Sequence, residues 1–478
     1  IKNLFLVMIR LLLLIILLVC FQNHTQATDK KVVIYGHAPS YANDEIVLLK
    51  YANYISKQEI SLDTAQVDST GSFRLSFSLS SITRVFTHLG IYNCYLYAEP
   101  GNQYEVILPE KVEKKHAQKL NPFFEETEVH LAVKNFERDD LNFSIRSFNQ
   151  SYLPYYNKHV YDVFVRHNFD DLDSAITSIQ KPFEEIEHQY FRIYTRYKLA
   201  RLRYLAYQRK SKRISDQFFL NQKVWYQNDA YMELFNKVYD NYFTFFGRTE
   251  EGKTIYSDIS EDKSLSALKN TLDTDDVLSN DTLKEFVILK CIHDEFYEDN
   301  FSRSALLTIL DSLQMTTKIP THKETALEIR KKITRLLPGH APPSFALYDR
   351  DSSLIRLSDF EGDYVYLNFC SCQSYSCINE FNILEEFQSR HKQHVTIVTV
   401  AVDEKFNTMT RFLERFPFEW KFLHYANQPD ILEKYDIRGF PTYFLISPEG
   451  KLLLSPAPSP SEGFGEQLFY IMKNRKDL

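Results

Sequence analysis

Residues 364–381, with the sequence YVYLNFCSCQSYSCINEF, decide the fold predicted for the C-terminal part of this 478-residue chain. The first six residues form an alternating, β-rich run, and residues 378–388 have the spacing of a helix. Between them lies a predicted loop that holds Cys370, Cys372 and Cys377. A helix N-terminus offers unpaired N–H groups and a positive dipole end, which stabilise a thiolate. This stretch therefore predicts thiol chemistry at a strand-to-helix junction.

The residues around this stretch alternate between strand and helix patterns. Proline and glycine at 338–339 end the preceding helical pattern, and strands are then predicted at 364–369, 395–402 and 442–446. Helices are predicted at 378–390, 405–416 and 463–473. Such an alternation predicts an α/β domain, a mixed sheet flanked by helices, over residues 338–478.

Two further domains are predicted upstream. Residues 28–112 have the two-residue period of strands, with turn signals at 68–71 and 99–102, and predict an antiparallel β-sandwich. Between residues 113 and 337 the period changes to that of helices, which predicts an all-α region. One of its helices is predicted to begin at Pro182, a residue that suits a first helical turn. This region carries no motif that predicts a function.

The first 27 residues have the organisation of a signal peptide. Basic residues precede an apolar run at 11–19, which is too short to span a bilayer, and small residues predict cleavage after Ala27. Cys20 leaves a lipid anchor as the alternative, although Val19 is larger than the residue preferred before an acylated cysteine. We expect a periplasmic or cell-envelope protein that meets the membrane only through such an N-terminal anchor.

Composition and residue spacing exclude several other classes of function. The formal net charge is −7 and no basic face is evident, so we expect no nucleic-acid partner. His391 and His394 lack acidic or cysteine neighbours at metal-ligand spacing, so we expect no metal site and no cofactor. Cys94 lies in an alternating β stretch and Cys291 in an apolar helical stretch, and both are expected to be buried apolar side chains.

Six motifs between residues 338 and 475 resemble the TlpA/ResA branch of the thioredoxin-like fold, a group of exported thiol–disulfide oxidoreductases. In chain order they are Gly339-x-Ala-Pro-x-x-Phe345, Leu357-Ser-Asp-Phe-x-Gly362, Leu367-Asn-Phe369, Cys377-x-x-Glu-Phe381, Ala401-Val-Asp-Glu404 and Tyr435-x-Ile-x-Gly-Phe-Pro-Thr442. The β region, through Asp68-x-x-Gly-x-Phe73 and Glu99-Pro-Gly-Asn102, also resembles a module of multidomain proteins from Bacteroidetes-type bacteria.

The resemblance implies roles for three residues outside the cysteine cluster. The bond before Pro441 is expected to be cis, so that the backbone of Phe440 faces the thiol site and pairs with an extended substrate. Glu380 is expected one turn into the helix, where the family uses a glutamate to tune the acidity of a cysteine such as Cys377.

The cysteine motif departs from the family pattern. The family carries Trp-Cys-x-x-Cys, and an ungapped alignment places Gln373 at the tryptophan and Ser374 at the attacking cysteine, so that Cys377 alone matches. A serine hydroxyl has too high a pKa to replace a thiolate in disulfide exchange. The ordinary two-cysteine mechanism therefore cannot operate on Ser374-Tyr-Ser-Cys377.

Three interpretations stay open. In the first, Cys377 pairs with Cys372 or Cys370, with Cys372 the expected partner, and the protein exchanges disulfides with protein thiols. In the second, Cys377 acts alone on a peroxide, because Ser374-x-x-Cys377 resembles the Thr-x-x-Cys of peroxiredoxins. In the third, the domain is redox-inactive and binds extended peptide segments.

Overall fold

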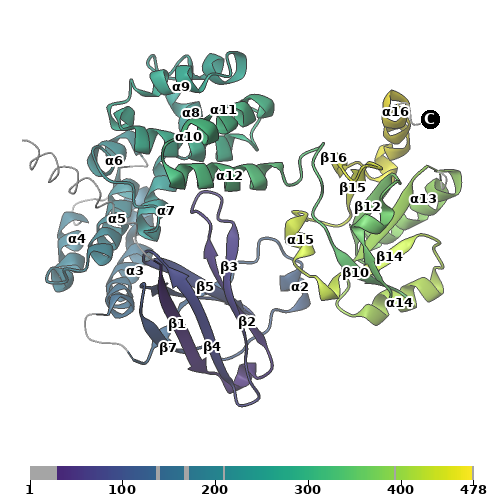
Figure 1. The fold of residues 1–478 in the computed structure, drawn as a ribbon, viewed down its shortest axis with the longest axis horizontal. Coiled ribbons are helices and arrows are strands. Elements are labelled where there is room, and N and C mark those ends of the chain that lie inside the picture. The colour runs from purple at the N-terminus through teal and green to yellow at the C-terminus, as the bar shows by residue number, and fades with distance from the viewer. Residues whose placement is uncertain (1–28, 136–139, 166–171, 208–209, 392–393, 476–478) are drawn as a thin grey trace, which may run out of the picture. The chain divides into compact units, whose positions relative to one another are not determined.

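The computed structural model describes residues 29–135, 140–165, 172–207, 210–391 and 394–475 (Figure 1). The predicted signal peptide, including Cys20, lies outside these ranges. Contacts divide the chain into two compact units: one holds residues up to 112, 127–242 and 275–283, and the other holds residues 113–126, 243–274 and 284 onward. Within the described ranges, no helix combines the length and the apolar character that crossing a bilayer requires. The helical residues are shared between the two units.

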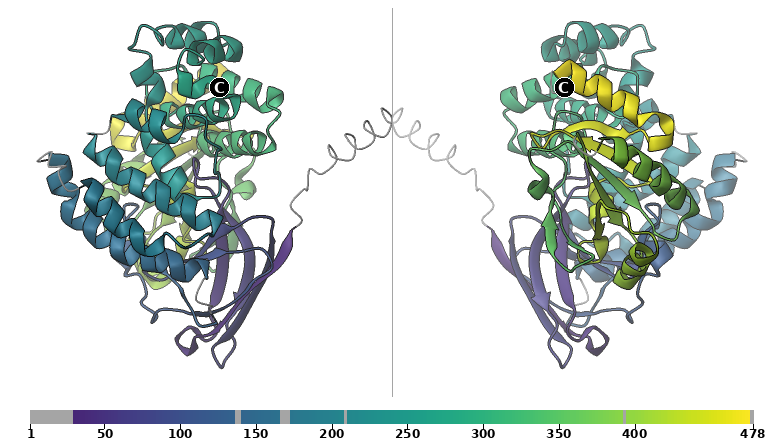
Figure 2. Two further views of the ribbon diagram at one scale, coloured as in Figure 1. Left: turned by 90° about the vertical axis from the view of Figure 1, so that its left-hand side faces the viewer. Right: turned by 90° about the vertical axis from the view of Figure 1, so that its right-hand side faces the viewer.

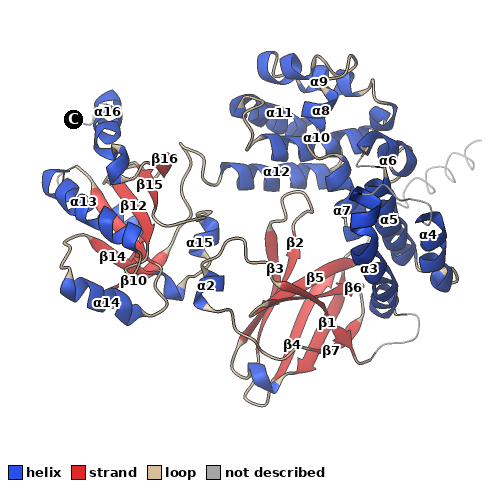
Figure 3. Cartoon of the chain, turned by 180° about the vertical axis from the view of Figure 1, so that it is seen from behind, coloured by secondary structure: helices blue, strands red, loops and turns tan. Residues whose placement is uncertain are grey.

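The N-terminal strands form two sheets, which are coloured red in Figure 3. One has the order β4-β1-β7-β9 and the other β3-β2-β5-β6-β8. The strands are β1 Lys30–His37, β2 Glu45–Tyr51, β3 Glu59–Gln66, β4 Ser72–Leu79, β5 Thr83–Leu89, β6 Tyr92–Ala98, β7 Gln103–Ile107, β8 Thr127–His130 and β9 Ala132–Val133.

The two sheets face each other across an apolar core. Alternate residues of β4 are buried, as expected for a strand with one face on a core, and Ile34, Leu75, Val85 and Leu96 belong to the same buried cluster. Most pairings are antiparallel, as predicted, but β1–β7 and β6–β8 are parallel. The sequence did not predict these two pairings because register between distant strands leaves no local signal.

Five helices of the first unit follow the strands: α3 Leu141–Val165, α4 Leu172–Gln180, α5 Gln189–Ala206, α6 Ser211–Phe218 and α7 Asp229–Val238. The sequence predicted that the helix now seen as α5 begins near Pro182. In the structure Pro182 lies in a separate 3-10 turn, and α5 starts at Gln189. Asn228 caps α7, because its side-chain oxygen accepts the N–H of Tyr231 at 3.1 Å.

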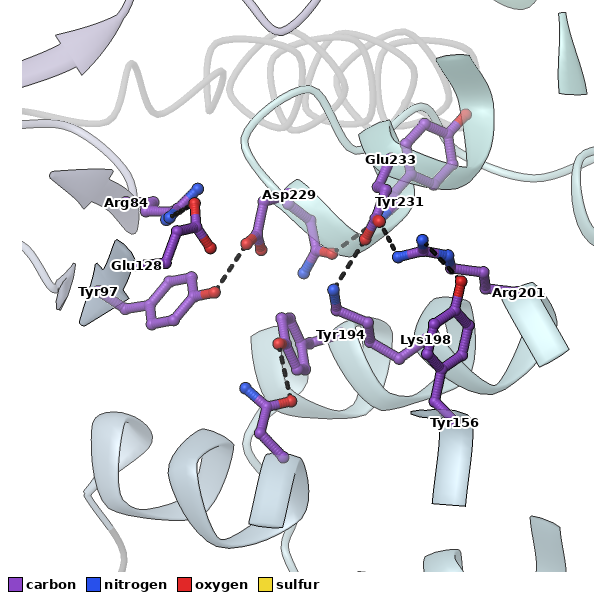
Figure 4. A network of polar contacts seen from close by, with 12 residues as sticks. Arg84, Tyr97, Glu128, Tyr156, Tyr194, Lys198, Arg201, Asp229, Tyr231 and Glu233 are labelled. Atoms are coloured by element: carbon purple, nitrogen blue, oxygen red, sulfur yellow. Dashed lines mark hydrogen bonds and ion pairs between the residues drawn. The ribbon is translucent and has the colours of Figure 1, made fainter. Parts of the chain in front are cut away.

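A network of polar contacts joins α5 and α7 to the sheet of β6 (Figure 4). The Tyr97 hydroxyl donates to Asp229 Oδ2 at 2.7 Å, and Lys198 Nζ donates to Glu233 Oε2 at 2.8 Å. Arg201 also forms an ion pair with Glu233. Because each carboxylate receives donors from another element, the network fixes how this sheet and these helices pack.

The second unit begins its helical part with α2 His116–Lys119, α8 Tyr242–Phe246, α9 Leu265–Leu272, α10 Asp281–Glu295, α11 Arg303–Thr316 and α12 Pro320–Thr334. Glu285 ties three of these elements together: its carboxylate accepts from Lys269 at 2.6 Å and from His322 at 2.9 Å. Burial alone raises the pKa of Glu285, but hydrogen bonds from His322, Lys269 and Thr317 lower it to about 2. Cys291 of α10 is fully buried, as predicted, and so is Cys94 in the first unit.

The C-terminal residues fold as a seven-stranded mixed sheet of order β11-β10-β14-β13-β12-β15-β16. The strands are β10 Ala346–Asp349, β11 Leu354–Arg356, β12 Val365–Cys370, β13 Thr396–Ala401, β14 Lys421–His424, β15 Thr442–Ile446 and β16 Leu452–Ala457. The strands β12, β13 and β14 are parallel, whereas β15 runs antiparallel to β12. This is the mixed α/β sheet that the sequence predicted, with β12 near its centre.

Helices cover both faces of this sheet. They are α13 Tyr375–His391, α14 Phe406–Arg415, α15 Ile431–Lys434 and α16 Phe464–Arg475. The right-hand view of Figure 2 shows α13, α14 and α16 in front of the strands, and their buried side chains share one core with Tyr366 and Cys370. The helix α15 packs in the core on the other face with Leu367 and Phe369. All six residues of β12 are therefore buried.

Candidate active site

Cys370 is the last residue of β12. The prediction that it lies in the loop is therefore wrong. Cys370 pairs with Ala401 of β13, and its carbonyl accepts the N–H of Val402 at 2.9 Å. The ladder of parallel hydrogen bonds thus continues one residue beyond the alternating run. Its side chain is fully buried on the face that α13 covers.

Asp403, two residues beyond the end of β13, holds the loop between β12 and α13. Its Oδ1 accepts the Ser371 hydroxyl at 2.8 Å, and its Oδ2 accepts the N–H of Cys372 at 3.0 Å. The Asp403 side chain is only 3% exposed, so these bonds form away from water, where they are strong. The Asp403 carboxylate therefore holds the loop in place, in addition to β12 and α13, which flank it.

Cys372 is held as a neutral thiol in this loop. Burial raises its pKa, and the adjacent carboxylate of Asp403 raises it further by its charge and by accepting a hydrogen bond from the thiol. A thiol in such surroundings is a poor nucleophile, because the thiolate is the reactive form.

Cys377 lies in the first turn of α13 and is fully buried. The Cys370 thiol donates a hydrogen bond to its sulfur and lowers the pKa of Cys377, although burial opposes the shift. The backbone of Ser371 and the hydroxyl of Ser374 lower this pKa further. The sulfur also sits at the positive end of the helix dipole, which favours a thiolate.

The two sulfurs in contact have opposite tendencies. Burial raises the pKa of Cys370 well above its usual value, and donating its proton toward Cys377 raises it further. Cys370 and Cys377 therefore titrate as a coupled pair, in which a negative charge is favoured on Cys377 and a proton on Cys370.

Glu380 lies in the next turn of α13, as predicted, but its carboxylate is engaged elsewhere. It accepts the N–H of Ser461 at 3.3 Å and also the Ser461 hydroxyl. Its charge contributes to the raised pKa of Cys370, after burial and the contact with Cys377.

The bond between Phe440 and Pro441 is cis, as the sequence predicted. Both residues are partly exposed at the start of β15, and Phe440 packs against the cores on both faces of the sheet.

Two buried polar atoms lie unpaired on neighbouring strands of this site. Asn368 of β12 is directly opposite Tyr443 of β15. Among the described residues, neither Asn368 Oδ1 nor the Tyr443 hydroxyl has a hydrogen-bond partner. The Tyr443 ring stacks on Tyr366 at a centroid distance of 5.0 Å, and the Tyr366 hydroxyl donates to the Pro458 carbonyl at 2.6 Å.

Part of the chain is similar in sequence to known proteins. The model of the AhpC/TSA family matches residues 338–454. The thiol-disulfide oxidoreductase ResA of Geobacillus thermodenitrificans is 32% identical over 120 residues, which are 25% of this chain and 68% of that protein. This chain belongs to the ResA/TlpA-like thioredoxin-fold family.

Further proteins are similar to about a quarter of this chain. ResA of Bacillus subtilis is 32% identical over 116 residues, 24% of this chain, and only 64% of its own length is matched. A solved thioredoxin domain of a thiol-disulfide oxidoreductase from Bacteroides vulgatus is 24% identical, with a TM-score of 0.26, over 28% of this chain and 97% of that one. A thiol-disulfide oxidoreductase from Bacteroides fragilis is 18% identical, with a TM-score of 0.25, over 27% and 99%.

The ResA/TlpA-like domain brings together some of the predicted site residues and separates others. Cys370 and Cys377 are in contact, whereas Cys372 faces Asp403 and Glu380 faces Ser461. Sequence reasoning noted Asp403 only as part of the motif Ala401-Val-Asp-Glu404 and gave it no role. It did not find Tyr443, because an aromatic residue in a buried strand looks like any other core residue.

Proposed function

We propose that the ResA/TlpA-like domain exchanges thiols and disulfides through the pair Cys377 and Cys370. The observation that carries this proposal is the hydrogen bond from the Cys370 thiol to the Cys377 sulfur, with the pKa of Cys377 lowered and that of Cys370 raised. A nucleophilic thiolate beside a protonated second thiol is the arrangement that disulfide exchange requires. The predicted substrates are protein thiols and disulfides.

The proposed reaction has two steps. The Cys377 thiolate attacks one sulfur of a substrate disulfide; that S–S bond breaks, a mixed disulfide forms, and the other substrate sulfur leaves as a thiolate. This thiolate takes the proton of Cys370, whose sulfur then attacks Cys377 and releases the remaining substrate thiolate. The substrate has gained two electrons, and the domain holds a Cys370–Cys377 disulfide.

The contacts favour Cys370 over Cys372 as the partner of Cys377. The sequence alone favoured Cys372, although a flexible loop would let either cysteine reach Cys377. In the structure the loop is tied to Asp403, which also accepts the thiol hydrogen of Cys372. The Cys370 thiol, by contrast, already donates a hydrogen bond to the Cys377 sulfur.

Burial limits how a protein substrate reaches the thiolate. Cys377 is 0% exposed, so the side chains that cover its sulfur must move before a protein disulfide reaches it. We propose that the backbone of Phe440 beside Pro441 holds the extended substrate while this happens. We further propose that Glu380 tunes the thiol pair through its charge beside Cys370.

The same burial supports a second candidate, the reduction of a hydroperoxide. A hydroperoxide is small enough to enter where a protein is not, and the Ser374 hydroxyl already contacts Cys377. The Cys377 thiolate would attack the terminal peroxide oxygen; the O–O bond breaks, the sulfur becomes a sulfenic acid, and the alkoxide or hydroxide that leaves takes a proton from water. The Cys370 thiol would then condense with it, giving the same disulfide and one water molecule.

Disulfide mapping by mass spectrometry tests the main proposal. Full-length protein is equilibrated in oxidised and reduced glutathione, alkylated, digested and analysed, with insulin reduction measured in parallel. We expect a Cys370–Cys377 disulfide in the oxidised sample and reductase activity in the reduced one. Three free thiols in both samples, together with no reductase activity, would overturn the proposal and leave a redox-inactive peptide-binding domain. Turnover of hydrogen peroxide without insulin reduction would favour the second candidate.

We also propose a periplasmic or cell-envelope location, supported by the apolar run at residues 11–19 and the small residues before position 28. Cell fractionation tests this location. A variant that lacks residues 1–27 should stay in the cytoplasm, and export of that variant would contradict the proposal.

A further inference from the structure

The hydroxyl of Tyr443 is buried on the face of the sheet that carries Cys370, and it has no hydrogen-bond partner among the described residues. Tyr443 is 2% exposed and lies directly opposite Asn368 of β12. Tyr366 and Cys370 stand two residues before and two residues after Asn368, on the same face of the strand. Both are therefore diagonal neighbours of Tyr443, at a separation that an aromatic side chain spans.

The Tyr443 hydroxyl remains a hydrogen-bond donor wherever the thiols react. Burial raises its pKa, and negative charge on Cys370 and on Cys377 raises it further. Because both sulfurs act on it, the hydroxyl lies within electrostatic range of the thiol pair. It therefore keeps its proton at any pH at which a thiolate forms on either cysteine.

The other donors that β12 and β15 place on this face already have acceptors. The Tyr366 hydroxyl donates to the Pro458 carbonyl at 2.6 Å, and Asn368 Nδ2 donates to the Val398 carbonyl at 3.3 Å. The thiol of Cys370 donates to the sulfur of Cys377. Among these described side chains, Tyr443 is the one whose donor atom has no acceptor.

The second step of the proposed reaction creates a buried negative charge on Cys370. In the reduced pair Cys370 holds its proton and donates it toward Cys377. Once Cys377 is bound to a substrate sulfur, Cys370 gives up that proton and must attack as a thiolate. Its sulfur is 0% exposed, so water does not solvate the charge, and a buried charge without a donor is costly.

We propose that Tyr443 is a catalytic residue of this second step, in which its hydroxyl turns to donate a hydrogen bond to the Cys370 thiolate. This inference rests on the proposed function. The Cys370 sulfur attacks Cys377, the bond between Cys377 and the substrate breaks, and the substrate sulfur leaves with the electron pair as a thiolate. Tyr443 keeps its own proton throughout. A charge-assisted hydrogen bond of this kind stabilises the attacking thiolate.

Tyr443→Phe tests this inference, because it removes the hydroxyl and keeps the ring that stacks on Tyr366. Reduced full-length protein is mixed with oxidised glutathione and quenched with acid at intervals. Mass spectrometry then follows the glutathione adduct on Cys377 and the Cys370–Cys377 disulfide. We expect the adduct to form within about twofold of the wild-type rate and to resolve about tenfold more slowly. The midpoint of the resolution rate against pH should move upward.

Tyr366→Phe is the matched control, since it removes a neighbouring hydroxyl that already has an acceptor, and its adduct should resolve at the wild-type rate. Urea unfolding separates catalysis from packing. Tyr443→Phe should raise the unfolding midpoint, because an unpaired buried hydroxyl is lost, whereas Tyr366→Phe should lower it.

Resolution of the adduct at the wild-type rate in Tyr443→Phe would overturn this inference and leave the proposed function standing. Slower resolution with a lowered unfolding midpoint would assign the hydroxyl to packing and would also overturn it. A wild type that forms neither the adduct nor the Cys370–Cys377 disulfide would overturn the proposed function, and this inference with it.

Discussion

The thiol site of the ResA/TlpA-like domain and the polar network around α5 both withdraw polar side chains from water, but they pair them differently. In the network of Figure 4, Glu233 lies between Lys198 and Arg201, and Asp229 accepts the Tyr97 hydroxyl. In the thiol site Asn368 Oδ1 and the Tyr443 hydroxyl stay unpaired among the described residues. The charge favoured on Cys377 is stabilised there by hydrogen-bond donors.

The two sites therefore differ in how they affect the stability of the fold and in the chemistry that they support. A completed set of ion pairs fixes packing, and removing one member leaves the others without a partner. A site with unpaired buried atoms and one acidic sulfur costs stability, and proteins retain such sites where they serve chemistry.

Cys377→Ser should abolish disulfide exchange, because a hydroxyl does not ionise in the range where a thiolate attacks. Insulin reduction by the full-length protein measures the effect. Cys291→Ala, which removes a fully buried thiol far along the chain from the site, is the control and should retain activity. Activity that survives in Cys377→Ser would show that the reactive thiol lies elsewhere.

Cys370→Ser and Cys372→Ser should differ strongly from each other. We expect Cys370→Ser to lower exchange roughly 100-fold, because the mixed disulfide then has no second thiol in contact with it. Cys372→Ser should change the rate less than about threefold, because its thiol is engaged by Asp403. Steady-state rates of disulfide exchange by both variants measure the difference. A larger loss of rate in Cys372→Ser than in Cys370→Ser would indicate that Cys372 is the partner of Cys377.

Glu233→Gln should destabilise the first unit by about 2 kcal/mol, because Lys198 and Arg201 lose a shared, partly buried partner. Urea unfolding gives the change in free energy. Glu250→Gln removes the exposed partner of Lys253 and should change stability by less than about 0.5 kcal/mol. Equal effects of the two substitutions would mean that the network adds nothing beyond surface charge.

The thiolate of Cys377 should persist to lower pH than an ordinary cysteine thiolate, because its folded-state pKa is lowered. By linkage, this group stabilises the fold above its unfolded pKa, and the contribution is lost as pH falls through the folded pKa. Ultraviolet absorbance of thiolates against pH, compared between wild type and Cys377→Ser, measures the titration. Cys370→Ala should move the midpoint upward, and an unmoved midpoint would remove Cys370 as the donor.

Much of the fold was predictable because its signals are local. The alternating run before Cys370, the helical spacing after Cys377 and the six motifs predicted the α/β domain, which the structure and the relatives confirm. The early β pattern likewise predicted two sheets. The helix predicted from Pro182 was placed wrongly at its start, because a proline that fits a first helical turn fits a 3-10 turn equally well.

The sequence by itself determined that three cysteines lie at a strand-to-helix junction and that Ser374 takes the place of an attacking cysteine. It did so because residue order and period fix which elements form and which side chains lie near their ends. Only the tertiary structure decided that Cys370 contacts Cys377 while Cys372 faces Asp403. These contacts depend on the direction in which each side chain leaves its strand, loop or helix, and that direction is set by neighbours distant in the chain.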